Sequence, residues 1–450
     1  MQLHDGCHAP KKILFISASA DGHFYPLTGL AKHLQSLGHD VRWYTQSFYK
    51  TKLEKLGIQH YPYVNAPQLN QENFTEHFPQ RADINGQLAK FKFDLEFCFF
   101  RPIPEGLKDL EAIHAEFAFD IVIADIFSFI IPVIKSRFKV PVIAAGVIPL
   151  MYTSKDLPPA GLGLLPARNI AERVKYAMMR WMSDKVLFSD IHKMYRELIA
   201  KYDAFYPGKN TFDTLYDAAD IVLQSCTPGF EYERRDLPSN IRFAGPMLPY
   251  SETKKWTPWF DERLTSYQTV IIVTQGTVEK DVNKLLVPTL QAFRDTDVLV
   301  VCTTGGSQTK ALRQRFAAGN IIIEDFIPFA DIMPYADVYI TNGGYGGVML
   351  SIQNELPLVV AGVHEGKNEI CARVGYFNYG RNLKTETPSP KQVKKAVHEI
   401  MSNPVYKTNI QRLKQEFSNY NANELCAQYV KHLTENRVRE VPRNAVSGNI

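Results

Sequence analysis

Hydrophobic residues along this chain gather in short runs that alternate with segments of helical periodicity. The first unit covers residues 11–45: an apolar run, then leucines and an alanine three or four positions apart, then the strand-length run "DVRWYT". Such spacing predicts one buried helix face, and the flanking runs suit buried parallel strands. Gly38 predicts the end of the helix and Pro26 its first turn, where a missing N–H costs no hydrogen bond. The pattern predicts a strand–helix–strand unit.

The same alternation continues through the first half of the chain. Further apolar runs occupy residues 119–127, 140–148 and 219–226, and a helical region covers residues 167–203. These runs predict an open parallel sheet. Between about residues 227 and 262 the periodicity lapses into a segment rich in proline, charge and aromatic residues, which indicates a linker between domains.

A second alternation follows the linker. The runs "TVIIVTQG", "DVLVVCTTGG", "NIIIEDFI", "ADVYITNGG" and "PLVVAG" are short, β-branched and separated by helix-length segments. They predict a second doubly wound domain. We therefore expect an α/β protein of two Rossmann-like domains with parallel sheets that face a central cleft. The expected boundaries are residues 1–243, residues 244–432 and a tail at 433–450.

Composition supports this picture of two globular domains. The 450 residues are 45% hydrophobic and 22% charged, and the chain is too long for one ordinary core. The formal charge of +4 is small and the basic residues are scattered, so nothing favours a nucleic-acid partner. The start of the chain lacks the apolar stretch of a signal peptide, and Asp120 and Asp125 interrupt the longest apolar run. We expect a cytoplasmic protein without stable membrane insertion. The six cysteines form no CxxC pair, which argues against a zinc site or a disulfide framework.

The segment "GGYGG" at residues 343–347 follows a predicted strand and precedes a short predicted helix. A loop in that position faces the ligand crevice, and its free N–H groups favour an anion such as phosphate. The alternative is a tight turn whose glycines only permit positive φ and close packing. The loops "TQGT" at 274–277 and "TTGGS" at 303–307 follow two other strands of the domain, and three such loops suit a diphosphate and a nucleoside. No Lys-Ser/Thr pair or GxGxxG motif supports a Walker A or NAD site.

In the first domain, His23 lies in the predicted loop after the first strand, and Asp125 ends another strand on the same side. A neutral imidazole can accept a hydroxyl proton, and a carboxylate beside it would fix its tautomer. The alternatives are a solvated His23 and an Asp125 that caps the following helix. No GxSxG or HExxH motif indicates a serine hydrolase or a zinc protease. The "DTD" at residues 295–297 precedes a strand, which is the wrong sheet edge for a metal-binding DxD.

Two blocks of the sequence resemble a known family. The block "ADGHFYPLTGLAKHLQSLGHDV" and the longer block at residues 326–383 are similar in order and spacing to the N-terminal and donor signatures of nucleotide-sugar glycosyltransferases. The resemblance is to the UDP-glycosyltransferase superfamily with the two-domain GT-B fold, and to its bacterial branch that glycosylates macrolides and flavonoids. It covers roughly residues 12–432.

The resemblance implies an inverting, metal-independent transfer without a cofactor, in which the nucleotide sugar is a co-substrate. His23 would remove the proton of the acceptor hydroxyl and Asp125 would orient His23. Gln275, Gly276 and Thr277 match the phosphate-contacting loop, Ile327 the position whose backbone meets the base, and Glu365 the acid that contacts sugar hydroxyls. The leaving diphosphate would lie against the glycine window, which comprises Asn342, Gly343, Gly344, Tyr345, Gly346 and Gly347.

Two features depart from the family pattern. Asn342 stands where most members carry a phosphate-contacting histidine, and Glu365-Gly366 stands where Asp-Gln is usual, so Gly366 cannot make the glutamine's sugar contact. A glucose donor needs its ring hydroxyls satisfied, whereas a deoxysugar needs fewer polar partners. UDP-glucose and dTDP- or UDP-rhamnose therefore both stay open as donors.

The acceptor is expected in the first domain, where apolar side chains suit a lipophilic small molecule such as a flavonoid or a polyketide. The candidates, which could equally belong to the core, are Phe24, Phe127, Phe129, Met151 and Tyr152, with the loop at residues 156–167. Two other functions stay open: a nucleotide-sugar epimerase or isomerase of the same architecture, and a binding protein without chemistry. We expect a monomer or weak dimer.

Overall fold

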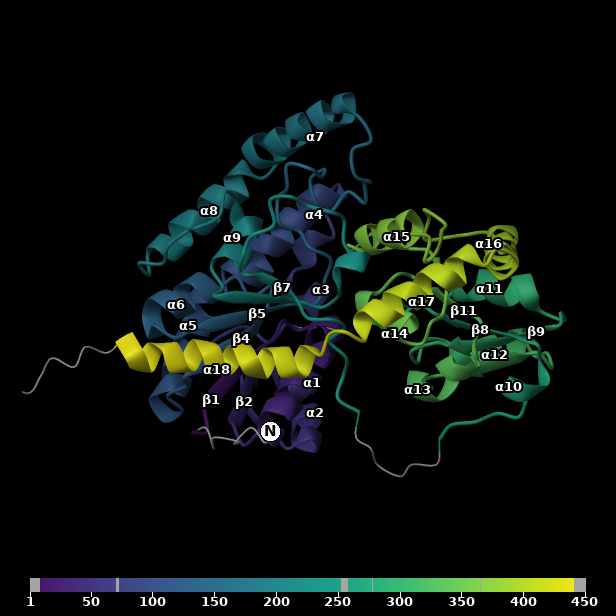
Figure 1. Cartoon of the computed structure of the whole chain (residues 1–450), viewed down its shortest axis with the longest axis horizontal. Coiled ribbons are helices and arrows are strands. Elements are labelled where there is room, and N and C mark those ends of the chain that lie inside the picture. Colours follow the sequence, from purple (N-terminus) through teal and green to yellow (C-terminus); the bar gives the residue numbers. More distant parts are fainter. Residues whose placement is uncertain (1–8, 70–72, 252–257, 277, 365, 441–450) are drawn as a thin grey trace, which may run out of the picture.

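A computed structural model of the chain describes residues 9–69, 73–251, 258–276, 278–364 and 366–440, with side chains described to residue 435. It contains two α/β domains side by side (Figure 1). Every strand pairing in both sheets is parallel, which confirms the predicted fold class.

The first sheet has seven strands in the order β3-β2-β1-β4-β5-β6-β7. Its strands are β1 Lys12–Ile16, β2 Asp40–Thr45, β3 Gln59–Pro62, β4 Ile121–Asp125, β5 Val142–Gly146, β6 Ile221–Gln224 and β7 Ile241–Phe243. The helices of this domain are α1 Asp21–Ser36, α2 Lys50–Leu56, α3 Phe74–His77, α4 Gln87–Asp94, α5 Ile103–Glu116, α6 Ile131–Phe138, α7 Ile170–Met182, α8 Ser189–Ala200 and α9 Thr211–Asp217. The helical region predicted at 167–203 is α7, a π-helical turn at Ser183–Leu187, and α8.

The second sheet has six strands in the order β10-β9-β8-β11-β12-β13. Its strands are β8 Thr269–Thr274, β9 Val298–Thr303, β10 Ile321–Glu324, β11 Val338–Thr341, β12 Leu358–Val360 and β13 Gly380–Asn382. The helices that follow the linker are α10 Arg263–Ser266, α11 Leu286–Phe293, α12 Thr309–Arg315, α13 Phe329–Ile332, α14 Tyr345–Gln353, α15 Lys367–Tyr376, α16 Pro390–Ser402, α17 Val405–Phe417 and α18 Ala422–Glu440.

Alternate residues of the central strands fill the two faces of each sheet. In β1, Leu14 and Ile16 belong to one core cluster while Ile13 and Phe15 belong to the cluster on the opposite face. Successive side chains of a strand point to opposite faces, so a continuous apolar run places hydrophobic groups on both. The helices that cover both faces bury these groups.

The first helix begins earlier than the sequence pattern predicts. α1 starts at Asp21, so Pro26 is its sixth residue and not part of a first turn, and His23 lies on the helix instead of in a loop. Pro26 cannot donate the hydrogen bond that a helix residue gives to the carbonyl four positions earlier. The buried face formed by Leu27, Leu30 and Leu34 keeps the helix continuous through this defect.

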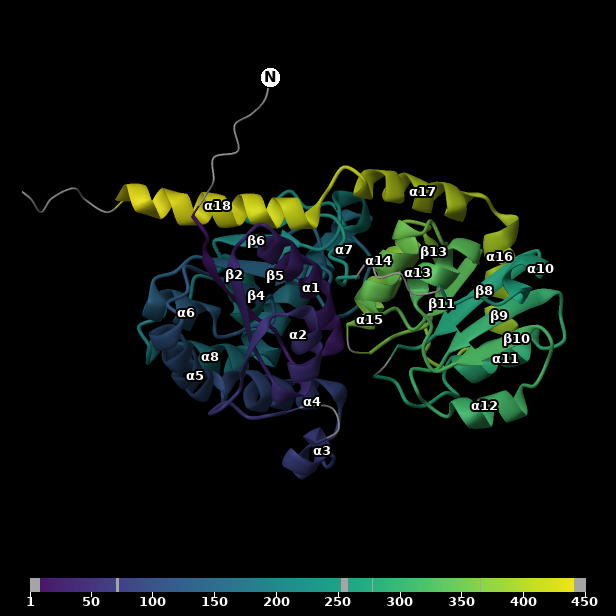
Figure 2. The same ribbon diagram turned by 90° about the horizontal axis from the view of Figure 1, so that it is seen from below.

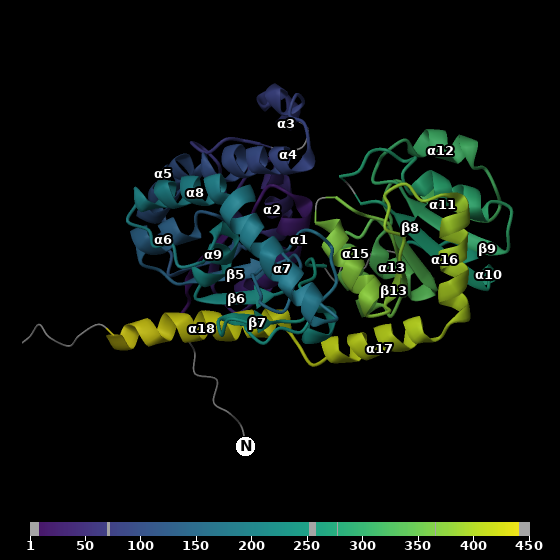
Figure 3. The same cartoon turned by 90° about the horizontal axis from the view of Figure 1, so that it is seen from above.

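The C-terminal helix does not belong to the second domain. α18 returns to the first domain, as Figures 1 and 2 and the view from above in Figure 3 show, and lies against α1. Its residues Ala422, Cys426 and Val430, spaced four apart, are buried in the core cluster that contains Leu27. The predicted boundary at residue 432 and the tail at 433–450 are therefore corrected: the helix continues to Glu440, and residues 441–450 lie outside the described chain.

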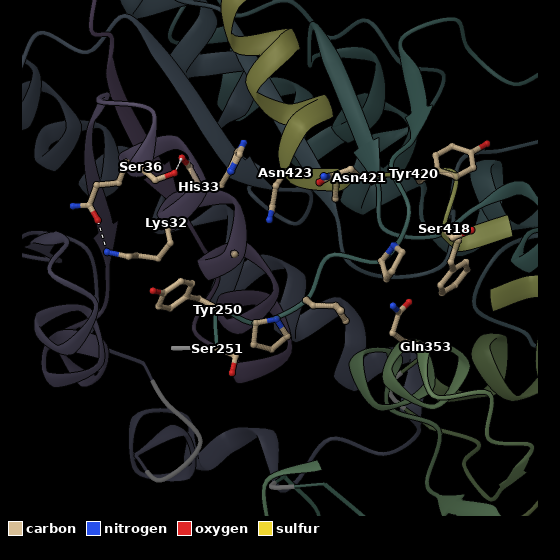
Figure 4. A pocket seen from close by; sticks show the side chains of 17 residues that line it. Lys32, His33, Ser36, Tyr250, Ser251, Gln353, Ser418, Tyr420, Asn421 and Asn423 are labelled. Atoms are coloured by element: carbon tan, nitrogen blue, oxygen red, sulfur yellow. Dashed lines mark hydrogen bonds between the residues drawn. The ribbon is translucent and has the colours of Figure 1, made fainter. Parts of the chain in front are cut away.

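The chain passes between the domains at two places that lie close together. Residues 246–251 lead from the first domain toward the second, and residues 417–423 lead back. Together with Lys32, His33 and other residues of α1 they line a largely polar groove (Figure 4). We call this the crossing groove.

Candidate active site

The carboxyl ends of the parallel strands place the predicted loops side by side. In the second sheet Thr274 is in register with both Thr303 and Thr341, the last residues of β8, β9 and β11. The loops that begin at Gln275, Thr304 and Asn342 therefore emerge as neighbours at one edge. Their predicted convergence is confirmed.

His23 and Asp125 meet at the carboxyl edge of the first sheet. Nδ1 of His23 lies 2.9 Å from Oδ1 of Asp125, with side-chain exposures of 21% and 0%. This contact rules out the alternative that Asp125 never touches His23. An ionised carboxylate only accepts hydrogen bonds, so Nδ1 carries the proton and Nε2 of the neutral ring keeps a lone pair. Oδ2 of Asp125 is buried and has no hydrogen-bond partner among the described residues.

The electrostatic surroundings of His23 act in opposite directions. Burial lowers the pKa of the imidazole, but the negative charge of Asp125 and its hydrogen bond outweigh that effect. The pKa of His23 therefore lies above its ordinary value of 6.5. A raised pKa makes the neutral ring a stronger base, which suits it to take a proton from a hydroxyl.

The five predicted acceptor residues divide into three groups. Phe127 is partly exposed, and its ring lies edge-on to His23 with the centroids 5.7 Å apart. Phe24 is fully buried and stacks on Tyr49 at 4.2 Å, and Phe129 is 2% exposed in the core of the first domain. Phe24 and Phe129 are therefore core residues and not acceptor contacts.

Met151 and Tyr152 are half-buried and contact α9. The amide of Met151 donates to the hydroxyl of Tyr216, and the hydroxyl of Tyr152 lies 3.4 Å from a carboxylate oxygen of Asp217. Both side chains also pack against the core of the first domain. Their role toward an acceptor stays a prediction.

Close packing requires glycine at two of the four glycine positions of the window and not at the other two. Gly343 has φ +84°, and a Cβ there would lie 2.6 Å from Sγ of Cys371, while a Cβ at Gly347 would lie 2.9 Å from the hydroxyl of Tyr339. Close packing therefore explains these two. A Cβ at Gly346 would meet nothing within 4 Å, and one at Gly344 only the side chain of Asn342 at 3.9 Å. Packing does not explain Gly344 and Gly346, which leave the start of α14 open to a ligand.

The start of α14 carries free N–H groups. The amide of Val348 bonds to the carbonyl of Gly344, so the amides of residues 345–347 precede the first hydrogen bond inside the helix. These amides and the helix dipole form a site suited to an anion.

Tyr345 has a different role from the one predicted. Its buried hydroxyl donates to the carbonyl of Ser225 at 2.7 Å and lies 3.2 Å from Nε2 of Gln224, at the carboxyl end of β6. The side chain fixes the start of α14 against the first sheet, so its hydroxyl is not available to contact a nucleotide-sugar donor. Since β6 lies two strands from β4, this contact is roughly 10 Å along the sheet edge from the end of β4. The contact thus brings the start of α14 close to the carboxyl edge of the first sheet, where His23 and Asp125 meet.

Asn342 links two of the loops that were predicted to bind the nucleotide-sugar donor. Its side-chain amide donates to the backbone carbonyl of Gln275 at 2.5 Å. Gln275 is buried, and its Oε1 has no hydrogen-bond partner among the described residues. Gly276 has φ +74°, and nothing lies within 4 Å of a Cβ there. The predicted contacts Thr277 and Glu365 lie outside the described residues.

Ile327 has its side chain in the core of the second domain and is 6% exposed. Any contact with a nucleobase must therefore come from its backbone, as expected. Gly366, which replaces the usual glutamine, has φ +76° at the start of α15.

A buried ionic network joins the two domains, and nothing in the sequence pattern predicted it. Arg373 of α15 is 1% exposed and bonds at 2.7 Å to Glu231, which lies between β6 and β7 of the first domain, and at 2.9 Å to Glu369. Glu369 also accepts the backbone amides of Gly161 and Gly163, both at 2.8 Å. The loop at residues 156–167, which was predicted near the acceptor, is thereby attached to α15, the helix that follows the predicted sugar contact at residue 365.

Among the described residues, no group of three or more His, Cys, Asp and Glu side chains is arranged to hold a metal ion. No described helix has both the length and the hydrophobicity needed to span a bilayer.

Comparison with known proteins agrees with this geometry. The family model for UDP-glucoronosyl and UDP-glucosyl transferase matches residues 113–419. The 4'-demethylrebeccamycin synthase of Lentzea aerocolonigenes is 32% identical over 90% of this chain and 96% of its own length. UDP-glucosyltransferase 1 of Beauveria bassiana is 29% identical over 90% of this chain and 91% of its own. The crystal structure of CalG4, the calicheamicin glycosyltransferase, has the same fold, with a TM-score of 0.73 at 19% identity over 97% of this chain and all of that one.

Proposed function

The chain belongs to the UDP-glucoronosyl and UDP-glucosyl transferase family and is a glycosyltransferase, and from this premise we propose that it inverts the sugar's anomeric centre without a metal ion. The proposed donor is a nucleoside diphosphate sugar, and the proposed acceptor is the hydroxyl group of a lipophilic natural product. The hydrogen-bonded pair of His23 and Asp125 is the observation that carries this proposal.

In the proposed reaction, the acceptor hydroxyl lies next to Nε2 of His23. Nε2 takes the hydroxyl proton while the oxygen attacks the anomeric carbon from the face opposite the diphosphate. The bond between that carbon and the diphosphate oxygen breaks, and the leaving group departs with its electron pair. Asp125 stabilises the imidazolium that forms.

The leaving diphosphate gains negative charge as it departs. The free amides of residues 345–347 at the start of α14 are the donors proposed to stabilise it. Donors fixed by the fold need no reorganisation during the reaction, so they stabilise the transition state without a metal ion. The tie between Asn342 and Gln275 supports this by holding two donor loops together.

The family supports a uridine diphosphate donor, and glucose or rhamnose is proposed as the sugar. For the acceptor, the partly exposed Phe127 beside His23 offers an aromatic face to a flat ring system such as a flavonoid or a polyketide. The relatives whose names include rebeccamycin and calicheamicin support a natural-product acceptor.

The test compares His23→Ala with His398→Ala, which removes an exposed histidine of α16. Turnover is measured with UDP-glucose and dTDP-rhamnose against a flavonol panel, and UDP affinity by thermal shift. His23→Ala should keep UDP binding and lose roughly 10²–10⁴-fold in turnover, while His398→Ala stays at the wild-type rate. Unchanged turnover in His23→Ala would remove the proposed base. An altered sugar formed from donor alone would instead indicate an epimerase, and UDP binding without any product a binding protein.

A further inference from the structure

Helix α7 carries a row of exposed apolar side chains on the outer side of the first domain. Ile170, Val174, Met178 and Trp181 are 79%, 64%, 64% and 61% exposed. At 100° per residue these positions fall within an arc of about 80°, so they form one continuous ridge about 16 Å long. Figure 1 shows α7 at the edge of the domain, away from its sheet. We call these four side chains the α7 ridge.

The opposite side of α7 is attached to the protein. The hydroxyl of Tyr176 donates to the carbonyl of Leu165 at 3.1 Å, and Arg180 donates to the carbonyl of Leu157. The side chain of Asn169 accepts the amide of Glu172 and fixes the start of the helix. The ridge is therefore held outward in a fixed orientation.

Basic residues border the ridge. Arg173 and Lys175 are exposed and lie about 60° beyond its two sides on the helical wheel. Residues 168–187 contain five basic and two acidic side chains. Both acidic groups are partly buried: Glu172 bonds to Arg168, and Asp184 faces Asn210. Glu172 thus neutralises Arg168, and the positive charge beside the ridge comes from Arg173 and Lys175.

We propose that the α7 ridge docks on the surface of a membrane that contains anionic lipid. An apolar stripe bordered by lysine and arginine is the arrangement with which a helix lies in the interface plane, with its apolar side among the acyl chains and its cations at the headgroups. A helix of 13 residues is about 20 Å long, too short to span a bilayer and long enough to lie on one.

Charge argues against a second copy of this chain as the occupant. Two ridges paired about a twofold axis would bring the same basic borders together, and like charges in contact destabilise an interface. An anionic lipid surface has the complementary charge.

The position of the ridge connects it to the cleft. The loop before α7 exposes Leu162 and Leu165, which are 50% and 43% exposed. The same loop contacts Glu369 across the interdomain space through Gly161 and Gly163. A lipophilic acceptor dissolved in the membrane would then have a short route to the site. Lipid binding itself does not depend on the proposed reaction.

The experiment measures co-sedimentation of the full chain with vesicles of phosphatidylcholine, with and without about one-third phosphatidylglycerol to supply a negative surface potential. We expect binding to the anionic vesicles that weakens with salt, and a blue shift of Trp181 emission that is absent in Trp181→Phe.

The double variant M178S/W181S removes half of the ridge and should lose at least tenfold in binding. R173E/K175E should lose at least roughly tenfold as well, because each basic group near the surface contributes about 1 kcal/mol.

The controls remove an exposed methionine and reverse two charges on α16, as Met401→Ser and K391E/K394E, and should bind like the wild type. Equal binding by M178S/W181S and the wild type would overturn the proposal, as would no binding to anionic vesicles. Two other results would replace it. A wild-type dimer that M178S/W181S converts to monomer would identify a homodimer interface. A raised KM for a soluble acceptor, with vesicle binding unchanged, would make the ridge a wall of the acceptor site.

Discussion

At the residue scale, the hydrogen bond between His23 and Asp125 determines which ring nitrogen can take a proton. Because Nδ1–H points at the carboxylate, only Nε2 is free to act as the base. The carboxylate also raises the pKa of His23, so the neutral ring dominates only when the pH exceeds a value above 6.5. In the proposed reaction, activity should therefore depend on pH through this pair.

The pH dependence of kcat/KM tests this link. In the wild type kcat/KM should rise with pH through an apparent pKa above 6.5, since only the neutral ring acts as a base. Asp125→Asn removes the charge that raises the pKa, so the rise should move to lower pH while the maximal rate falls. The free energy of unfolding should change with pH in the opposite direction to kcat/KM. A raised pKa of His23 in the folded state stabilises the protein below about pH 6.5, and this stabilisation is lost as the pH rises through the folded-state pKa. An unshifted profile in Asp125→Asn would contradict the pairing.

The same substitution at two phenylalanines distinguishes core from site. Phe24→Leu changes a fully buried ring and should lower the free energy of unfolding by about 1–3 kcal/mol without altering the acceptor KM. Phe127→Leu changes the ring beside His23 and should raise the acceptor KM several-fold with little loss of stability. Urea unfolding and initial rates measure both. If Phe24→Leu raised the acceptor KM, the assignment of Phe24 to the core alone would be wrong.

At the element scale, the start of α14 combines two requirements in one short segment. Gly343 and Gly347 allow the turn and the helix to pack closely on Cys371 and Tyr339, while Gly344 and Gly346 keep the amides accessible. The sequence pattern alone could not divide the four glycines in this way, because the division depends on neighbours brought by other strands and helices.

Two glycine substitutions should separate these requirements. Gly346→Ala adds a methyl group in open space and improves helix propensity, so stability should rise by up to about 1 kcal/mol. UDP affinity should nevertheless fall at least tenfold, because the methyl group occupies the approach of the diphosphate. Gly347→Ala should instead lower the free energy of unfolding through its clash with Tyr339. Calorimetric titration with UDP and denaturant unfolding give the two readouts; wild-type UDP affinity in Gly346→Ala would mean that the diphosphate lies elsewhere.

The sequence predicted the central strands and one edge strand, β10 with the sequence "IIIE", but none of the other three edge strands. Runs such as "IVIAD" and "VIIVT" are hydrophobic at every position that two covered faces require. The strands that were not predicted, β3, β7 and β13, are short edge strands with the sequences "QHYP", "IRF" and "GRN". An edge strand has one paired neighbour and can be partly exposed, so polar residues are tolerated there, and in these three strands the hydrophobic pattern is lost.

At the scale of the whole molecule, contacts between distant residues fix how the domains face each other. Tyr345 reaches Ser225 across 120 positions, and Arg373 reaches Glu231 across 142. The His23–Asp125 pair could be predicted because both residues end up at the carboxyl edge of one sheet. The interdomain contacts could not, since no local periodicity encodes a partner in another domain.

The ionic network gives a stability prediction. Arg373→Met removes the cation of Glu369 and leaves Glu231 with Arg234, whose Nη2 lies 3.5 Å away, and should lower the free energy of unfolding by about 3 kcal/mol. The matched control is Arg381→Met, which breaks a half-exposed pair with Glu399 and should cost no more than about 1 kcal/mol. Urea unfolding compares the two variants. Equal losses would show that the buried network contributes no more than an ordinary surface pair.

The return of α18 to the first domain changes how such proteins can be recombined. A crossover that swaps everything after the linker would also replace Ala422, Cys426 and Val430, and so would put foreign side chains into the recipient's own core. The part that can be exchanged as a unit is an insert bounded by the two chain crossings of the crossing groove, at residues 246–251 and 417–423. Chimeras built with two junctions there should inherit a new donor preference while keeping the recipient's final helix.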